Sequence, residues 1–256
     1  MLKIKEYVKV ESLEQAYELN QKKTNCVIGG MLWLKMVTRN VQKAIDLSGL
    51  GLDQIEENDE EFSIGAMVTL RQIELHEGLN TWSQGAVKES VTHIVGVQFR
   101  NLATVGGSIF GKFGFSDVLS CFLAFDSYVE LHHEGIIPLD QFAANKYPND
   151  ILMRLIIKKH PQESVYLSHR NTKTDFPVLT CAVSLGEKEA YAVVGARPSR
   201  ACRVRLSDQW MEQIKDEVTG QMNFGSNMRG SAAYREQLSK VLLRRGFEQL
   251  EERREK

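Results

Sequence analysis

The stretch "NLATVGGSIFGKFGFSD", residues 101–117, decides how this chain is interpreted. It contains a Gly-Gly pair at 106–107, two further glycines, and a single carboxylate at Asp117. A second Gly-Gly pair, at 29–30, ends the apolar run "NCVIGG". Because glycine lacks a Cβ, the backbone can turn with a positive φ, and a ligand can come close to its N–H groups.

The glycine pairs and Asp117 allow two interpretations. Consecutive free N–H groups form a concave nest for an anion such as pyrophosphate, and two such turns could flank one diphosphate. An ionised aspartate only accepts hydrogen bonds, so Asp117 would suit a ribose hydroxyl. Alternatively, both pairs are simply tight turns or bulges. Residue chemistry alone leaves both interpretations open.

The composition is that of an ordinary globular protein. The chain has 256 residues, 43% hydrophobic and 25% charged, with 32 basic and 33 acidic side chains. This balance does not indicate nucleic acid or an anionic membrane as a partner. No apolar run approaches the roughly 18 residues that suggest a membrane span. The first 20 residues are charged throughout and lack a signal-peptide core, so we expect a cytoplasmic protein.

The chain shows no pattern for metal binding or for side-chain catalysis. A metal or iron–sulfur site usually contains two closely spaced cysteines, because both thiolates must reach one centre. Here the four cysteines are far apart, and we expect buried, reduced thiols: Cys26, Cys121, Cys181 and Cys202. There is no G-x-G-x-x-G, P-loop or H-E-x-x-H motif, and no strong Ser-His-Asp set. We therefore predict no catalytic side chain and no metal ligand.

The pattern of elements predicts an α+β protein with two domains, 1–158 and 159–256. Helices and strands alternate in the first domain, where Ser12 is expected to cap a helix and the acidic run 56–61 to form a hairpin tip. The second domain is predicted to be a small sheet closed by a long helix. The predicted apolar face of that helix comprises Tyr234, Leu238, Val241, Leu242 and Phe247.

Three motifs resemble the FAD-binding subunits of molybdenum hydroxylases, the xanthine dehydrogenase and carbon monoxide dehydrogenase family. Residues 98–131, "QFRNLATVGGSIFGKFGFSDVLSCFLAFDSYVEL", resemble its second flavin motif, Q-I-R-N-x-A-T-I-G-G-N followed by S/N-D. "VIGGMLWLKM", 27–36, lies where that family has A-G-G-T-D-L. The tail "NMRGSAAYREQLSKVLLRR", 227–245, resembles D-x-R-G-S-A-x-Y-R ending in V-L-x-R-R.

This resemblance implies a fold and a set of cofactor contacts. The implied fold is a two-lobed FAD-binding domain of the PCMH or vanillyl-alcohol-oxidase-like type, followed by a small α+β C-terminal domain of the CO dehydrogenase flavoprotein type. One segment would cradle the pyrophosphate and ribityl chain from one side, a second would do so from the other, and Asp117 would hold the ribose. The implied contacts are Val27, Ile28, Gly29, Gly30, Met31, Leu32, Trp33, Val95, Thr104, Gly106, Gly107, Ser108, Asp117 and Leu152.

The chain departs from the family pattern at three places. Met31 and Leu32 replace the usual polar pair, and Ser108 replaces an asparagine. A lysine that the family often has near the flavin falls here at Leu167 or Ser168. Each lost hydrogen bond would cost on the order of 1 kcal/mol, about fivefold in affinity.

The resemblance implies the FAD-binding subunit of a xanthine dehydrogenase-like molybdenum hydroxylase complex. Its partners would be a molybdopterin-binding subunit and a subunit with [2Fe–2S] clusters, and electrons would pass through FAD to an acceptor such as NAD+. The alternative is the same fold with weak or no flavin binding, acting as a structural or docking subunit of such a complex. Met31, Leu32 and the missing lysine favour that alternative.

Overall fold

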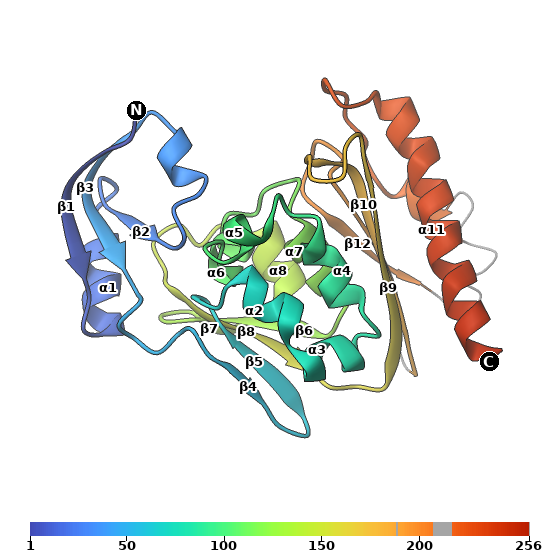
Figure 1. Ribbon diagram of the computed structural model, residues 1–256, viewed down its shortest axis with the longest axis horizontal. Helices are drawn as coiled ribbons and strands as arrows, with labels where there is room; N and C mark the ends of the chain where they lie inside the picture. Colours follow the sequence, from blue (N-terminus) through green and yellow to red (C-terminus); the bar gives the residue numbers. More distant parts are fainter. Residues whose placement is uncertain (188, 207–216, 256) are drawn as a thin grey trace. The chain divides into compact units, whose positions relative to one another are not determined.

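The computed structural model describes residues 1–187, 189–206 and 217–255 (Figure 1). The chain forms two compact units, each assembled from separate segments. Unit 1 comprises Met1–Gln72, Val97–Gly111 and Ser127–Ile157, and unit 2 comprises Ile73–Gly96, Lys112–Asp126 and Lys158–Lys256. Both contain helices and strands, as the sequence predicts. The predicted domain boundary after residue 158 stays a prediction.

Unit 1 begins with a small parallel sheet in the order β1-β3-β2. The helix α1 follows β1, and Ser12 caps it as predicted, its Oγ accepting a hydrogen bond from Gln15 N at 3.1 Å. Val10, Ala16 and Ile45 form the centre of a small core beside this sheet. The bounds are β1 (Lys3–Lys9), α1 (Leu13–Asn20), β2 (Cys26–Ile28), the 3-10 helix η1 (Leu34–Met36) and β3 (Asn40–Asp46).

The second sheet of unit 1 has the order β4-β5-β8-β6-β7. The antiparallel pairing of β4 with β5 confirms the hairpin predicted for the acidic run. The strands are β4 (Ile55–Glu57), β5 (Glu61–Gly65), β6 (Ser127–Leu131), β7 (Gly135–Pro138) and β8 (Leu152–Lys158). The short helices of unit 1 are α5 (Val97–Arg100), α6 (Val105–Phe110) and α8 (Leu139–Ala144), and α2 (Leu70–Leu75) extends from unit 1 into unit 2.

Unit 2 is an antiparallel sheet, β12-β11-β10-β9, with helices on both faces. The odd-numbered side chains of β10, such as Val183, pack against α11, whereas Thr180 Oγ1 on the opposite face donates a hydrogen bond to Ser120 Oγ of α7 at 3.0 Å. Figure 1 shows α11 lying along this sheet. The elements are α3 (Glu77–Trp82), α4 (Ala86–Thr92), α7 (Asp117–Phe122), β9 (Gln162–Arg170), β10 (Pro177–Gly186), β11 (Ala190–Gly195), β12 (Cys202–Leu206), α10 (Glu217–Gly220) and α11 (Ala232–Arg254).

The cysteines are free thiols in strands and one helix. Cys121 and Cys181 are buried, as predicted, and burial raises the pKa of each thiol to about 12. Cys26 and Cys202 are only half-buried, so the prediction of burial was wrong for them. Within the described residues, no helix has the length and apolarity needed to cross a membrane.

The predicted apolar face of α11 was wrong at its first turn. Leu242 and Phe247 are buried, but Tyr234 is 46% exposed and its neighbour Arg235 is only 1% exposed. The Arg235 guanidinium donates to the carbonyls of Val178 at 3.0 Å and Gly225 at 2.8 Å. A buried guanidinium is stable when carbonyl oxygens accept the hydrogen bonds that it would otherwise donate to water. This requirement for carbonyl acceptors sets the rotation of α11 about its axis.

We predict that Arg235→Leu lowers the free energy of unfolding by about 2–4 kcal/mol, because it leaves buried carbonyls without donors. Urea unfolding of the two proteins measures this difference. Arg244→Leu is the control, because Arg244 is exposed on the same helix and its change should stay within about 0.5 kcal/mol. Equal stability of Arg235→Leu and the wild type would contradict this role for Arg235.

Candidate functional site

The two Gly-Gly segments lie against each other within unit 1. A Cβ on Gly29 would lie 2.6 Å from Thr104 Oγ1, and a Cβ on Gly30 would lie 1.8 Å from the carbonyl oxygen of Leu102. Both distances are shorter than any normal contact, so only glycine fits at either position. The structure therefore brings together the two motifs that the sequence placed about 75 residues apart.

The second Gly-Gly pair lies in the first turn of α6. Thr104 caps this helix, and its Oγ1 accepts a hydrogen bond from Gly107 N at 3.1 Å. Gly106 N donates to Ala66 O at 2.8 Å, and Ser108 N donates to Thr104 O at 3.1 Å. The N–H groups at the start of α6 are therefore already engaged within the chain.

The two glycines of α6 have different surroundings. A Cβ on Gly106 would lie 2.6 Å from Ala66 O, so this glycine is required by packing. A Cβ on Gly107 would meet only its own capping hydroxyl, Thr104 Oγ1, at 3.2 Å among the described atoms. Gly107 is therefore the position in α6 where a ligand has room to approach the backbone.

Two expectations about the glycines need correction. A positive φ was expected at the pairs, but it occurs at Met31, with φ 58°, and at none of the four paired glycines. Free N–H groups were expected at both pairs, but those of α6 bond within the chain, because the helix and its threonine cap need them. Among the described residues, none accepts a hydrogen bond from the N–H groups of Gly30, Met31 or Leu32. An anion nest is therefore available at the turn formed by residues 29–32, which we call the first glycine turn.

Apolar side chains surround the first glycine turn. Met31, Leu32 and Trp33 are each half-buried, and the Trp33 ring packs edge-on against Phe99 with ring centroids 5.6 Å apart. Val27 and Ile28 belong to β2, which leads into the turn, and Leu152 is buried in β8 of the same unit. The turn thus combines backbone donors with apolar walls.

Two predicted contact residues, Val95 and Asp117, belong to unit 2. Val95 is 44% exposed and has a φ of 51°. Asp117 is the first residue of α7 and is only 5% exposed. Its Oδ1 accepts hydrogen bonds from Tyr166 Oη at 2.6 Å and from Arg170 Nη2. This oxygen already has two donors, so the ribose contact expected from Asp117 stays a prediction.

Arg170 is a buried cation that the sequence did not predict as the partner of Asp117. Its Nη1 also donates to Asp175 O at 2.6 Å, and the Asp175 carboxylate pairs with Arg229 at 3.0 Å. Arg170 and Asp117 are 53 residues apart, and they meet because α7 packs on β10, the strand that pairs with β9.

Burial controls the protonation of this cluster. Burial raises the pKa of Asp117 to about 6, against the opposing effects of the Arg170 charge and the Tyr166 hydrogen bond. Burial and the nearby carboxylate raise the pKa of Tyr166 well above its usual value. At neutral pH, therefore, Asp117 is an ionised acceptor and Tyr166 is a neutral donor.

Residues 2–159 match the family model described as "FAD binding domain in molybdopterin dehydrogenase". This match covers more than half of the chain. The chain belongs to this family. It is an FAD-binding subunit of the molybdenum hydroxylase type within an oxidoreductase family, which confirms the resemblance seen in the motifs.

Relatives of similar length support the assignment along the whole chain. The YgfM protein of Escherichia coli strain K12 is 24% identical over 249 residues, covering 94% of each chain. The glyceraldehyde dehydrogenase medium chain of Sulfolobus acidocaldarius is 23% identical over 275 residues, covering 95% of this chain and 97% of that protein.

Solved structures share the fold. A chain of the Cu,Mo-CO dehydrogenase in its cyanide-inactivated form has a TM-score of 0.83 at 18% identity, covering 97% of this chain and 98% of its own. A chain of quinoline 2-oxidoreductase from Pseudomonas putida 86 has a TM-score of 0.81 at 16% identity, covering 94% of each. The predicted α+β fold of the CO dehydrogenase flavoprotein type is confirmed.

FAD is the cofactor of this family's domain, and the residues of unit 1 fit it. The unbonded N–H groups of Gly30, Met31 and Leu32 can donate to a pyrophosphate, whose oxygens need donors. The open Cβ direction of Gly107 leaves room for a group of that size beside α6. Met31 and Leu32 contribute backbone donors and no side-chain hydrogen bonds, in place of the polar pair usual in the family.

The pH dependence of stability tests the environment of Asp117. The carboxyl has a pKa of about 6 when folded and 3.8 as its ordinary value, so the folded protein holds an extra proton between those pH values. Its contribution to stability is therefore fully present below pH 4 and is lost as the pH rises through 6. We predict that the stability of the wild type relative to Asp117→Asn falls by about 3 kcal/mol from pH 4 to pH 7.

Urea unfolding at several pH values measures this difference, and Asp59→Asn, at an exposed hairpin position, serves as the control without such a trend. A difference that grows with pH would mean that the Arg170 charge outweighs burial and holds the Asp117 pKa below 3.8.

Proposed function

We propose that this chain is the electron-transferring flavoprotein of a xanthine dehydrogenase-like molybdenum hydroxylase complex. Bound FAD supplies the redox chemistry, because it can accept electrons one at a time and release them as a pair. The electrons would come from [2Fe–2S] clusters on a partner subunit, after oxidation of a substrate at a molybdopterin-binding partner. They would leave to a soluble acceptor such as NAD+, in the cytoplasm.

The observation that carries the proposal is the contact between the two glycine segments in unit 1. It fixes a turn with three unbonded N–H groups, at Gly30, Met31 and Leu32, against the loop that enters α6. A structure that needs only tight turns does not require unbonded donors in the middle of one. Donors without acceptors are what an anionic ligand completes.

The chain's own residues are assigned binding and positioning. The N–H groups of the first glycine turn would hold the pyrophosphate, and the 27–33 and 104–108 segments would fix its position. Trp33, packed on Phe99, would shield the site from water. No side chain is assigned a proton transfer, which agrees with a role in moving electrons through a bound cofactor.

The second candidate function is a structural or docking subunit that binds flavin weakly. The specific observation that favours it is the bonding at the start of α6. The N–H groups of Gly106, Gly107 and Ser108 donate within the chain, so they are not free to bind a ligand. Because Met31 and Leu32 also lack polar side chains, only the backbone N–H groups of the first glycine turn remain to bind the pyrophosphate of FAD. The two functions differ in FAD affinity, and both predict assembly with partner subunits.

Gly107→Val tests the proposed site. Its side chain would extend into the open direction beside α6, where the pyrophosphate is assigned, so we predict at least a tenfold loss of FAD affinity and a small change in melting temperature. FAD titration by calorimetry and a melting curve measure the two effects.

Gly106→Ala is the matched variant. Its Cβ would lie 2.6 Å from Ala66 O, so it should lower the melting temperature by several degrees. If folded Gly107→Val binds FAD as tightly as the wild type, the glycine serves the helix and not the ligand.

The proposed complex is tested by affinity purification of the tagged chain from its native cells. We expect a molybdopterin-containing subunit and a cysteine-rich iron–sulfur subunit in stoichiometric amounts, since this chain has no cysteine pair for a cluster of its own. Recovery of the chain alone as an active, substrate-oxidising flavoenzyme would contradict the proposal.

A further inference from the structure

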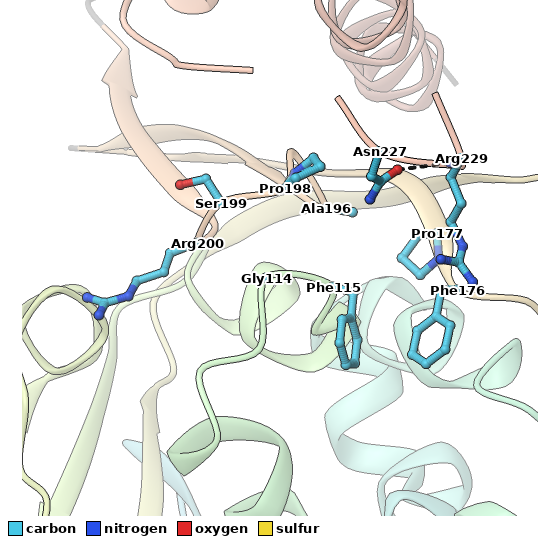
Figure 2. A pocket seen from close by; sticks show the side chains of 10 residues that line it. All are labelled: Gly114, Phe115, Phe176, Pro177, Ala196, Pro198, Ser199, Arg200, Asn227 and Arg229. Carbon is cyan, nitrogen blue, oxygen red and sulfur yellow. Dashed lines mark hydrogen bonds between the residues drawn. The ribbon is translucent and has the colours of Figure 1, made fainter. Parts of the chain in front are cut away.

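The loop before α11 contains a tight turn, residues 227–230, with Met228 at its tip. Asn227 N donates to Gly230 O, and Gly230 N donates to Asn227 O, each at 3.1 Å, which closes the turn. Arg229 N donates to Asn227 Oδ1 at 2.9 Å (Figure 2). Met228 is 94% exposed, the highest value among the large apolar side chains of the described residues.

A buried arginine, Arg235 of α11, holds this turn in one conformation. Its Nη2 donates to Asn227 Oδ1 at 2.6 Å, and its Nη1 donates to the carbonyl oxygen of Gly230. The same Nη1 donates to Gly225 O at 2.8 Å, just before the turn. Acceptors on both sides of Met228 are therefore fixed by one guanidinium. A turn that is preorganised in this way loses little conformational entropy when it binds a partner.

Exposed neighbours distinguish Met228 from an isolated apolar side chain. A single exposed apolar residue is common on protein surfaces and needs no partner. Here, however, a Cβ on Gly230 would lie 3.2 Å from Tyr234 Cδ1, so the exposed ring of Tyr234 packs beside the turn. Tyr234 Oη lies 3.2 Å from His169 Nε2, within hydrogen-bond distance, which fixes the ring. The turn and this ring form one exposed area.

A row of aromatic rings continues from the turn through Arg229. The Arg229 guanidinium lies 4.9 Å from the centroid of the Phe176 ring. The rings of Phe176 and Phe115 meet edge-to-face at 4.5 Å, and the exposed Phe113 stacks on Phe115 at 5.2 Å. Figure 2 shows Phe115 and Phe176 side by side, with Arg229 next to Phe176. Methionine, aromatic residues and arginine are enriched in protein–protein interfaces.

Charged groups give this aromatic row a positive margin. Asp175 pairs with Arg229 at 3.0 Å, so these two charges offset each other. Lys112 directly precedes Phe113, and burial and the nearby charge of Arg200 lower the pKa of Lys112 to about 8, so both groups are cations at neutral pH. In Figure 2 the Arg200 side chain points away from the aromatic rings, so its charge lies at the margin and not over the rings.

We propose that the 227–230 turn and the aromatic row beside it dock onto a partner subunit of the complex, with Met228 inserted into an apolar pocket that has carboxylates at its rim. Charge complementarity with the positive margin favours such a partner. A second copy of this chain is disfavoured, because a symmetric contact would carry the same positive margin on both sides. The inference rests on the assembly that the proposed function predicts, and it does not depend on bound FAD.

Oxidation of methionine by hydrogen peroxide, followed by mass spectrometry of peptides, tests whether a partner covers Met228. In the chain purified alone, Met228 should form sulfoxide at a rate similar to that of Met36, which is 72% exposed in unit 1. In the complex purified from native cells, we expect the Met228 rate to fall at least tenfold, because a pocket excludes the oxidant. An equal Met228 rate in the free chain and in the complex would overturn the proposal.

Substitutions at Met228 test whether this contact contributes to assembly. Met228→Asp would place a charge in the apolar pocket, within its acidic rim, so the amount of partner subunit that co-purifies should fall at least tenfold. Met228→Leu keeps an apolar side chain and should assemble normally. Ile136→Asp, at an exposed position of β7 in unit 1, is the matched control and should also assemble. Both aspartate variants should melt like the wild type, because neither side chain is buried. Normal assembly of Met228→Asp would contradict the docking role.

The same preparations separate this inference from the proposed function. A complex that contains FAD but leaves Met228 open to oxidation would overturn the docking surface and leave the electron-transferring role intact. A colourless complex in which Met228 is protected would support the docking surface and contradict that role. A homodimer of the purified chain that Met228→Asp converts to a monomer would overturn the choice of partner, as would recovery of the chain without any partner subunit.

Discussion

The backbone contact between the turn after β2 and the loop entering α6 is the constraint on which the cofactor-binding part of unit 1 depends. Gly30 lies so close to Leu102 that a Cβ would fall 1.8 Å from its carbonyl oxygen. Gly29 and Gly106 are equally restricted by Thr104 and Ala66. Three of the four paired glycines are therefore required for packing, and the packing in turn leaves the N–H groups of the first turn unbonded.

Much of the fold could be predicted from the sequence. The features that have local signals were predicted: Ser12 caps α1, the acidic run forms the β4–β5 hairpin, and β9, β10 and β11 follow one another as strands. The family could be predicted because three glycines of its motifs, Gly29, Gly30 and Gly106, leave no space for a Cβ. Each of these features is encoded by residues that lie close together along the chain, so a short stretch of sequence is enough to predict it.

The features that the sequence did not predict depend on distant contacts. Two glycines disfavour a helix by roughly 1 kcal/mol each, yet α6 forms because Thr104 caps it and Ala66 accepts from Gly106. Arg235, and not Tyr234 as predicted, lies on the buried face of α11, because carbonyls of β10 and of a nearby loop accept hydrogen bonds from its guanidinium. The Asp117–Arg170 pair likewise requires α7 to pack on β10, the partner strand of β9. A short stretch of sequence does not show which of these contacts will form.

The proposed role of unit 1 requires that the wild-type chain hold FAD noncovalently. The decisive measurement is the visible spectrum of the purified chain after incubation with FAD and removal of the free cofactor by gel filtration. We predict flavin absorption near about 370 and 450 nm, at about one FAD per chain and released on denaturation. A folded but colourless protein that also shows no heat of FAD binding by calorimetry would contradict the account.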